Sequence, residues 1–205
     1  MARVDDYIAA RRLALEELCQ CSFPDLARDS GYTLKPDGSL VLDFLDRTYR
    51  VTPPDYAFED EQDPGREVPI QEQVLILHYL QGAPLAEPAG EWVAFREIPG
   101  AAFYHATFAK RAIEPVKQAF GENPQALDAA APKLGGKRTE PGNHAWEFAP
   151  FPKVPLRIAL WRGDDELPSD ANVLFDKNAG RILSPEDLAW LAGMVVYRLM
   201  ALGRG

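Results

Sequence analysis

The sequence is poor in cysteine and histidine, and this scarcity limits the metal and redox chemistry it can support. Its 205 residues include only two cysteines and three histidines. Cys19 and Cys21 lie two positions apart, where a disulfide between them has poor geometry. Two thiols alone also cannot build a zinc or iron–sulfur site, which usually takes four ligands. We therefore expect reduced thiols in a reducing compartment.

Positive charge and long apolar runs are scarce as well. The 22 Lys and Arg residues are outnumbered by 31 Asp and Glu residues, which gives a formal net charge of −9. Such a surface repels a phosphate backbone or an anionic membrane on average, so we expect no nucleic acid and no membrane among the partners. No stretch approaches the ~20 apolar residues that span a bilayer, and the N-terminus lacks the apolar core of a signal peptide. These features predict a cytoplasmic protein.

The composition is that of an ordinary globular chain, with 46% hydrophobic and 26% charged residues. Its patterns predict a single α+β domain over 1–205, with an antiparallel or mixed sheet of about six strands packed by four to five helices. The expected parts are an N-terminal helix over 2–21, a meander over 32–52, an acidic loop over 53–68, a helix-rich middle over 69–134, and a sheet with a C-terminal helix over 144–202.

Two of the predicted helices have clear apolar faces. The face of the first comprises Val4, Ile8, Leu15 and Leu18. Arg11 falls inside this stripe, so its side chain must extend to solvent or pair. The last helix opens with a capping Ser184 and with Pro185 at its first position. Its apolar surface needs the core or a second subunit to cover it, which leaves a homodimer through this helix open.

The chain is organised around the stretch 150–176, which joins a buried-strand pattern, an acidic turn and a second apolar run. Clustered carboxylates can hold a hard cation such as magnesium, or divide acid and base roles between them. The candidate metal ligands are Asp164, Asp165 and Glu166, together with Asp176. Glycine followed by two aspartates is also ordinary turn chemistry, and three consecutive acids cannot all face one point.

The three histidines are not spaced as paired metal ligands. A lone histidine on an apolar helix face is more often a hydrogen-bonded core residue than a ligand. His105 is the best candidate, because it projects into the apolar face of the helix predicted over 101–120, which Pro115 should kink or divide. The candidate cofactor-binding residues are His105, His78 and Trp161, and His144 ranks below His105. No serine lies in a G-x-S-x-G elbow, and no catalytic residue is predicted.

Six segments stand in an order that resembles an uncharacterised family of unknown function (number 3786), found mainly in anaerobic bacteria and archaea. They are ILHYL (76–80), EWVAFREIPG (91–100), FPKVPL (151–156), LWRGDDELP (160–168), ANVLFD (171–176) and SPEDLA (184–189). The resemblance covers about 5–202. It carries no established activity. Some members have an added iron–sulfur domain, for which this chain lacks the cysteines, and the resemblance implies a cytoplasmic protein near redox or cofactor metabolism.

Three hypotheses about function follow from these residues. The first is a non-catalytic protein that binds a small cofactor, such as the tetrapyrroles corrinoid and haem, with aromatic strands lining the site and His105 as a ligand. The second is a metal-dependent enzyme that uses the acidic turn and Asp176 around a divalent ion. The third is an interaction module that dimerises through its last helix.

Overall fold

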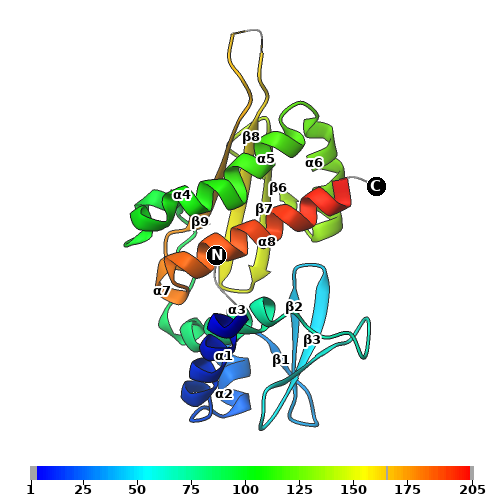
Figure 1. The fold of residues 1–205 in the computed structure, drawn as a ribbon, viewed down its shortest axis with the longest axis vertical. Helices are drawn as coiled ribbons and strands as arrows, with labels where there is room; N and C mark the ends of the chain where they lie inside the picture. The colour runs from blue at the N-terminus through cyan, green and yellow to red at the C-terminus, as the bar shows by residue number, and fades with distance from the viewer. Residues whose placement is uncertain (1–3, 165, 204–205) are drawn as a thin grey trace. The chain divides into compact units, whose positions relative to one another are not determined.

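The computed structural model describes residues 4–164 and 166–203, and the chain divides into two compact units (Figure 1). Unit 1 comprises the chain up to Glu87 together with Phe151–Lys153, and unit 2 comprises Pro88–Pro150 and the chain from Val154 onward. The predicted α+β class is confirmed. The prediction of one sheet of about six strands is wrong, because the described residues form two antiparallel sheets of four and five strands. The prediction of a single domain stays a prediction.

Unit 1 combines three helices with the four-stranded sheet. The helices are α1 (Val4–Leu18), α2 (Phe23–Ser30) and α3 (Ile70–Gly82), followed by a 3-10 turn at Ala83–Leu85. The sheet has the order β1 (Thr33–Leu34), β2 (Leu40–Phe44), β3 (Arg47–Thr52) and β4 (Ala57–Asp60). The predicted meander is therefore present. Strand β4 lies within the stretch predicted as an acidic loop, where Asp60 is buried and pairs with Arg47 at 3.0 Å.

The core of unit 1 forms around α3, which is apolar on nearly all sides as its sequence predicts. Tyr79 of this helix stacks on Phe151, with ring centroids 4.4 Å apart and planes 5° apart. Phe151 also contacts Phe44 of β2, at 5.1 Å between centroids. The hydroxyl of buried Tyr49 donates a 2.6 Å hydrogen bond to Oε2 of Glu72, which satisfies part of the buried carboxylate.

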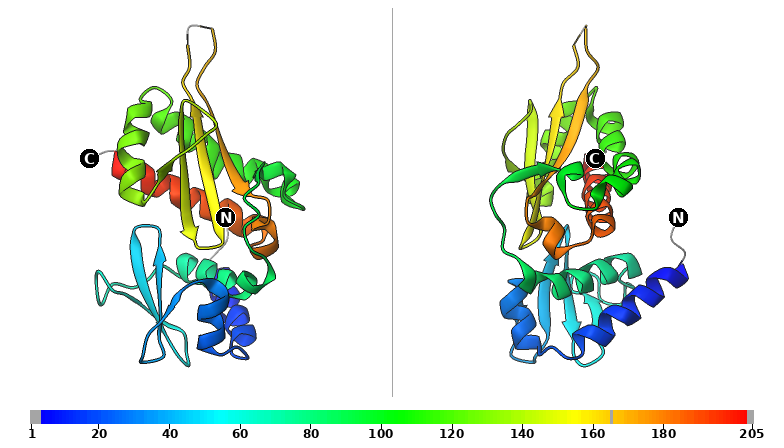
Figure 2. Two further views of the ribbon diagram at one scale, coloured as in Figure 1. Left: turned by 180° about the vertical axis from the view of Figure 1, so that it is seen from behind. Right: turned by 90° about the vertical axis from the view of Figure 1, so that its left-hand side faces the viewer.

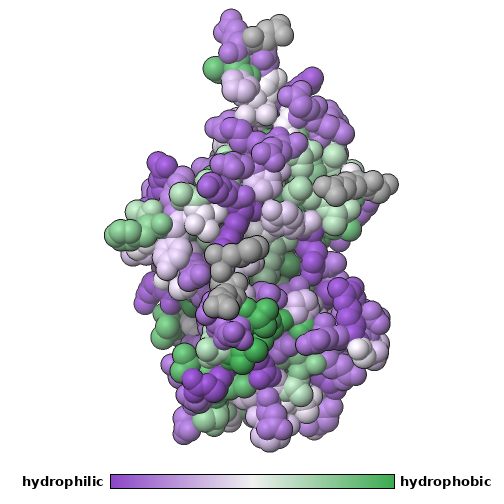
Figure 3. All heavy atoms as spheres, in the orientation of Figure 1, coloured by the Kyte–Doolittle hydropathy of each residue, from purple (hydrophilic) through white to green (hydrophobic). Residues whose placement is uncertain are grey.

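The apolar face predicted for the first helix is partly wrong. Val4 and Ile8 are 63% and 53% exposed, whereas Ala14 and Leu18 are buried. The buried face of the helix differs from the predicted one because Arg11 pairs inward. Its guanidinium donates to Oε1 of Gln73 (2.8 Å) and to the carbonyl of Tyr56 (3.1 Å). The helix thus turns its Arg11 side inward, and hydrophobic side chains remain at the surface over α1 (Figure 3).

Unit 2 is built on the five-stranded sheet, with helices gathered on one face (Figure 2). Its strands, in spatial order, are β5 (Trp92–Ala94), β9 (Asp170–Asp176), β8 (Val154–Trp161), β7 (His144–Phe151) and β6 (Lys137–Arg138). The register of β8 and β9 runs from Leu156 opposite Phe175 to Trp161 opposite Asp170. The acidic turn therefore joins the ends of these two strands.

The described residues form more helices than the four to five predicted for the whole chain. Within these residues, unit 2 alone has five α-helices and three 3-10 turns. They are the 3-10 turns Phe95–Glu97, Ala101–Tyr104 and Ala131–Leu134, and the helices α4 (His105–Phe108), α5 (Glu114–Phe120), α6 (Pro124–Ala130), α7 (Ala179–Ile182) and α8 (Pro185–Gly203). A π-helical stretch, Ala109–Ile113, joins α4 to α5. This stretch ends just before Pro115, whose ring cannot donate to the carbonyl of Arg111 and crowds it in a regular α-helix. The predicted interruption of the helix at Pro115 is therefore present as a π-helical turn.

Helix α8 begins as predicted, with the Ser184 hydroxyl accepting a hydrogen bond from the backbone N–H of Asp187 at 3.1 Å. The apolar face of α8 is buried within unit 2, with Leu188, Leu191 and Val195 fully covered. The core, rather than a second subunit, thus covers this surface. The homodimer stays a prediction, but the apolar face of α8 no longer supports it. No helix within the described residues is both long and apolar enough to cross a membrane.

Candidate functional site

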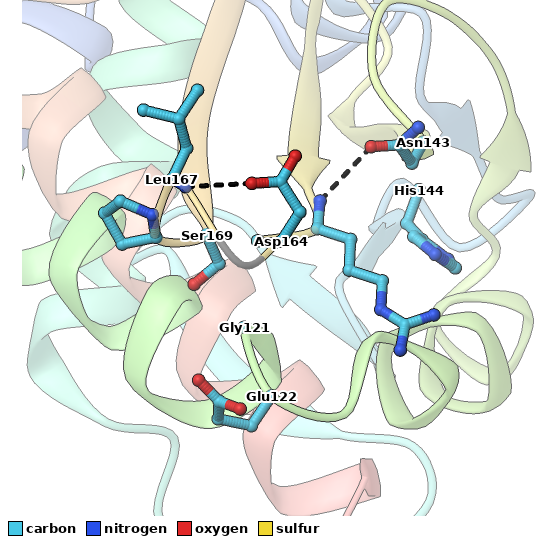
Figure 4. Close-up of a pocket in the computed structure, with 10 residues that line it drawn as sticks. Gly121, Glu122, Asn143, His144, Asp164, Leu167 and Ser169 are labelled. Carbon is cyan, nitrogen blue, oxygen red and sulfur yellow. Dashed lines mark hydrogen bonds between the residues drawn. The ribbon is translucent and has the colours of Figure 1, made fainter.

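A polar pocket of about 910 Å³ opens in unit 2 beside the turn that joins β8 to β9 (Figure 4). Its lining comes from the end of α5, the start of β7 and the turn itself. The lining residues are Gly121, Glu122, Asn143, His144, Arg162, Gly163, Asp164, Leu167, Pro168 and Ser169. Its volume falls in the range of small-molecule sites, about 300–1,000 Å³.

His144 is held in one orientation by Asp128 of α6. Nδ1 of His144 lies 2.7 Å from Oδ2 of Asp128, and the other carboxylate oxygen accepts from Nε1 of Trp146 at 2.8 Å and from Arg138 at 2.6 Å. An ionised carboxylate only accepts hydrogen bonds, so Nδ1 carries the proton and Nε2 of neutral His144 is the acceptor. His144 and Trp146 reach the same carboxylate because residues two apart on a strand share a face.

Arg162 supplies a positive charge to the same pocket. Its backbone N–H donates to Oδ1 of Asn143 at 3.2 Å, a bond drawn in Figure 4. Among residues 4–164 and 166–203, its guanidinium has no hydrogen-bond or ion-pair partner. Among the described residues, the pocket thus holds a guanidinium without a partner and an imidazole that Asp128 orients, together with the carboxylates of Glu122 and Asp164.

Asp164 shapes the turn rather than presenting a free carboxylate. Its Oδ1 accepts hydrogen bonds from the backbone N–H groups of Leu167 (2.8 Å) and Glu166 (2.9 Å). These two bonds, Leu167 first, lower the pKa of Asp164 below its ordinary value of 3.8, because they favour the ionised form. The carboxylate is therefore ionised at neutral pH and satisfied largely by its own turn.

The structure does not bring the predicted metal ligands together. Asp164 and Glu166 lie in the turn before β9, whereas Asp176 lies at the far end of this strand, about 20 Å along it at ~3.3 Å per residue. Asp176 is buried and accepts backbone hydrogen bonds from Ala89, Gly90 and Asn178. Asp165 lies outside the described residues. The part of the chain that the structure describes holds no group of three or more His, Cys, Asp or Glu residues able to bind a metal.

Two of the predicted cofactor-binding residues do meet in space. His105 and Trp161 line a second pocket of unit 2, of about 380 Å³, together with Arg96, Phe108 and Asn172. The third, His78, is half-buried on α3 of unit 1 and does not line this pocket.

The hydrogen bond of His105 bears directly on the tetrapyrrole hypothesis. Nη2 of Arg96 lies 3.2 Å from Nδ1 of His105, and a guanidinium can only donate. Nδ1 is therefore the acceptor, and Nε2 carries the proton, so it has no lone pair free for an iron or cobalt ion. Burial, and then the positive charge of Arg96, lower the pKa of His105, which favours this neutral form.

Sequence reasoning missed the residues that make the larger pocket. Asp128 lies 16 positions before His144, on a different element, and no spacing rule connects them. The alternation of His144 and Trp146 along β7 was a usable signal for a shared polar partner. Arg162 lies within the segment LWRGDDELP, where the metal-site prediction rested on the three acids that follow it.

Fold and pocket together define an α+β protein with a polar pocket in its second unit. The chain belongs to the family described as Domain of unknown function (DUF3786), whose model matches residues 22–198. The match includes Asp128, His144 and Arg162 and leaves α1 outside it. No curated protein and no solved structure matches the chain. Its function must therefore be argued from the site.

Proposed function

We propose that unit 2 binds a small anionic ligand, one bearing a carboxylate or phosphate group, in the pocket lined by Arg162 and His144. The observation that carries this proposal is the guanidinium of Arg162, which has no partner within the described residues and lines the same pocket as an imidazole oriented by Asp128. A planar guanidinium recognises both oxyanion types through two parallel hydrogen bonds.

His144 gives the pocket a second, adjustable contact. In its neutral form Nε2 accepts a hydrogen bond from a ligand hydroxyl or protonated acid, and in its charged form Nε2–H donates to an oxyanion. Asp128 holds the ring in one orientation in either form, because its carboxylate accepts the hydrogen bond from Nδ1 in both. The same arrangement suits proton transfer to or from a bound ligand.

This proposal keeps the idea of small-molecule binding and changes the site and the ligand. A haem or corrinoid bound through Nε2 of His105 would require the His105 ring to turn and to lose its hydrogen bond from Arg96. A divalent-metal site would require carboxylates that lie apart along β9 to converge. The Arg162 pocket requires neither change.

Isothermal titration calorimetry with inorganic phosphate and with succinate tests the proposal. We expect saturable binding of at least one of them at one site per chain. Arg162→Gln should weaken it at least tenfold, a loss of about 1.4 kcal/mol. The matched control is Arg181→Gln, which removes an exposed arginine of the same unit outside the pocket. Equal affinity in the two variants, or no binding of either anion, would contradict the proposal.

A further inference from the structure

The larger pocket of unit 2 is lined by charges of both signs. Arg162 supplies a guanidinium, and Glu122 and Asp164 supply carboxylates. Glu122 lies on the segment that follows α5, apart from Asn143 and His144 (Figure 4). When His144 is neutral, the lining therefore holds more negative than positive charge. A ligand whose groups are all anionic would be attracted by Arg162 and repelled by the carboxylates.

Glu122 is the carboxylate of this lining that remains available to a ligand. In residues 4–164 and 166–203 it makes no hydrogen bond and no ion pair. Asp164, in contrast, uses Oδ1 to accept two backbone hydrogen bonds of its own turn. Between the described side chains of Glu122 and Arg162 there is no ion pair either, although both line one pocket. The pocket thus offers two opposite charges that do not neutralise each other.

Neighbouring charges on other elements do not change this balance, because they pair among themselves. Arg138 lies 2.6 Å from Asp128 of α6, and Lys117 of α5 lies 3.2 Å from Asp170 of β9. Glu166 adds a negative charge in the turn, outside the lining. A ligand for this pocket is therefore favoured if it carries a cationic group as well as an oxyanion.

The hydrogen-bonding groups of the lining are mixed in the same way. Nε2 of neutral His144 is an acceptor, since Nδ1 faces Asp128. Within the described chain, Oδ2 of Asp164 accepts no hydrogen bond. An ammonium group has three donors and no acceptor, so it suits these acceptors together with the carboxylate of Glu122. The guanidinium of Arg162 only donates and suits a carboxylate.

We infer that the ligand of this pocket is a small amino acid in its zwitterionic form, with its carboxylate on Arg162 and its ammonium group on Glu122. The inference rests on the proposed function, in which Arg162 holds an oxyanion, and it adds the class of ligand. The volume of about 910 Å³ leaves room for a side chain beyond the two charged groups.

The test is an NMR titration of the whole chain with alanine and with γ-aminobutyrate, up to about 10 mM, followed at the imidazole signals of His144. These two amino acids hold their charges at a short and at a longer spacing. We expect a saturable shift with at least one of them. That amino acid should bind at least tenfold more tightly than its analogue without the ammonium group, which is propionate for alanine and butyrate for γ-aminobutyrate.

Three variants complete the experiment. Glu122→Gln should weaken binding of the amino acid at least tenfold, and it should leave phosphate binding unchanged or tighten it, because it removes a negative charge. Arg162→Gln should weaken binding of both ligands. The matched control is Glu114→Gln, which removes an exposed carboxylate at the start of α5, outside the pocket, and should alter neither.

The inference is overturned if neither amino acid binds more tightly than its analogue, or if Glu122→Gln and Glu114→Gln have equal effects. Phosphate or succinate binding that depends on Arg162, with no gain from an ammonium group, overturns this inference and leaves the anion site in place. No saturable binding of phosphate, succinate or either amino acid overturns both.

Discussion

At the scale of single residues, His105 shows how a hydrogen-bond partner decides what a side chain can do. Its position inside an apolar helix face made it the leading ligand candidate in the sequence. In the structure His105 lines a pocket, and its Nδ1 accepts a hydrogen bond from Arg96, so Nε2 carries the proton and is a donor. A residue's burial can be predicted from periodicity, but its tautomer depends on a partner nine positions away on another element.

We predict that His105 titrates below its ordinary pKa of 6.5 and is protonated at Nε2 at neutral pH. Burial is the larger cause and the charge of Arg96 the second. Because the pKa is lower in the folded state, the unfolded chain binds the proton more readily. The free energy of unfolding therefore decreases as the pH falls below about 6.5. ¹⁵N NMR of the imidazole measures the tautomer and the midpoint.

Arg96→Gln is the control for this prediction, and it should raise the midpoint of His105 toward 6.5 because it removes the charge. A midpoint at or above 6.5 in the unmodified chain, or a proton on Nδ1, would show that the Arg96 contact is not formed in solution.

We predict that Asp176 stabilises the fold and that both of its carboxylate oxygens are needed as hydrogen-bond acceptors. Oδ1 accepts from Ala89 and Asn178, and Oδ2 accepts from Gly90 at 2.7 Å. Asp176→Asn replaces one acceptor with an N–H donor that faces a backbone N–H, so we expect a loss of about 2–3 kcal/mol in the free energy of unfolding. Chemical denaturation measures it.

Asp170→Asn is the matched control at the other end of β9. Its side chain is exposed and its ion pair with Lys117 lies at the surface, so the expected change is below about 1 kcal/mol. Equal effects of the two substitutions would contradict the structural role. Stabilisation of the unmodified chain by magnesium, lost in Asp176→Asn, would instead support the metal hypothesis.

At the scale of elements, periodicity predicted the existence of helices and strands better than their faces or partners. The capped start of α8 and the nearly all-apolar α3 could be read directly, because capping and burial leave local signals. The buried side of α1 could not, since Arg11 pairs with a residue of α3 that no local pattern indicates. Strand pairing into two sheets likewise depends on contacts far apart in sequence.

Gly121 joins two elements of the proposed anion site and predicts an effect at this scale. It follows α5, and a Cβ atom at this position would lie 2.3 Å from Oγ of Ser169 in the β8–β9 turn and 2.5 Å from the backbone oxygen of Lys117. Gly121→Ala should therefore push the turn away from α5 and weaken anion binding, with an overpacking cost of about 1–3 kcal/mol. Calorimetric titration and thermal unfolding measure the two effects.

The double variant Gly121→Ala with Ser169→Gly serves as the rescue experiment, because it removes the Ser169 atoms that the new methyl group meets and leaves the backbone oxygen of Lys117, 2.5 Å away. Partial recovery of stability and affinity is expected. The same losses with and without Ser169→Gly would place the strain elsewhere.

At the scale of the whole molecule, the division into two units is the feature that the sequence did not predict. The structure assigns Phe151–Lys153 to unit 1, although these residues connect two long strands that belong mainly to unit 2, β7 and β8. Composition does not show that so short a segment belongs to unit 1. Its assignment depends on the rings that Phe151 contacts, Phe44 and Tyr79, which lie far away in the sequence.

Phe151→Ala tests whether the units respond separately. Loss of its stacking on Tyr79 and its contact with Phe44 should cost about 3–5 kcal/mol in unit 1. Hydrogen exchange should show a large loss of protection in α3 and a smaller one in α8. An equal loss of protection in both helices would contradict separate units and would favour the single domain predicted from the sequence.

The central claim, that Arg162 and His144 form an anion-binding site, is tested most directly by the imidazole signals of His144 during a titration with inorganic phosphate. The account predicts a saturable shift of these signals, and a shift at least tenfold harder to saturate in Arg162→Gln than in Arg181→Gln. His144 signals that stay unchanged at saturating phosphate, or that respond identically in both variants, would contradict it.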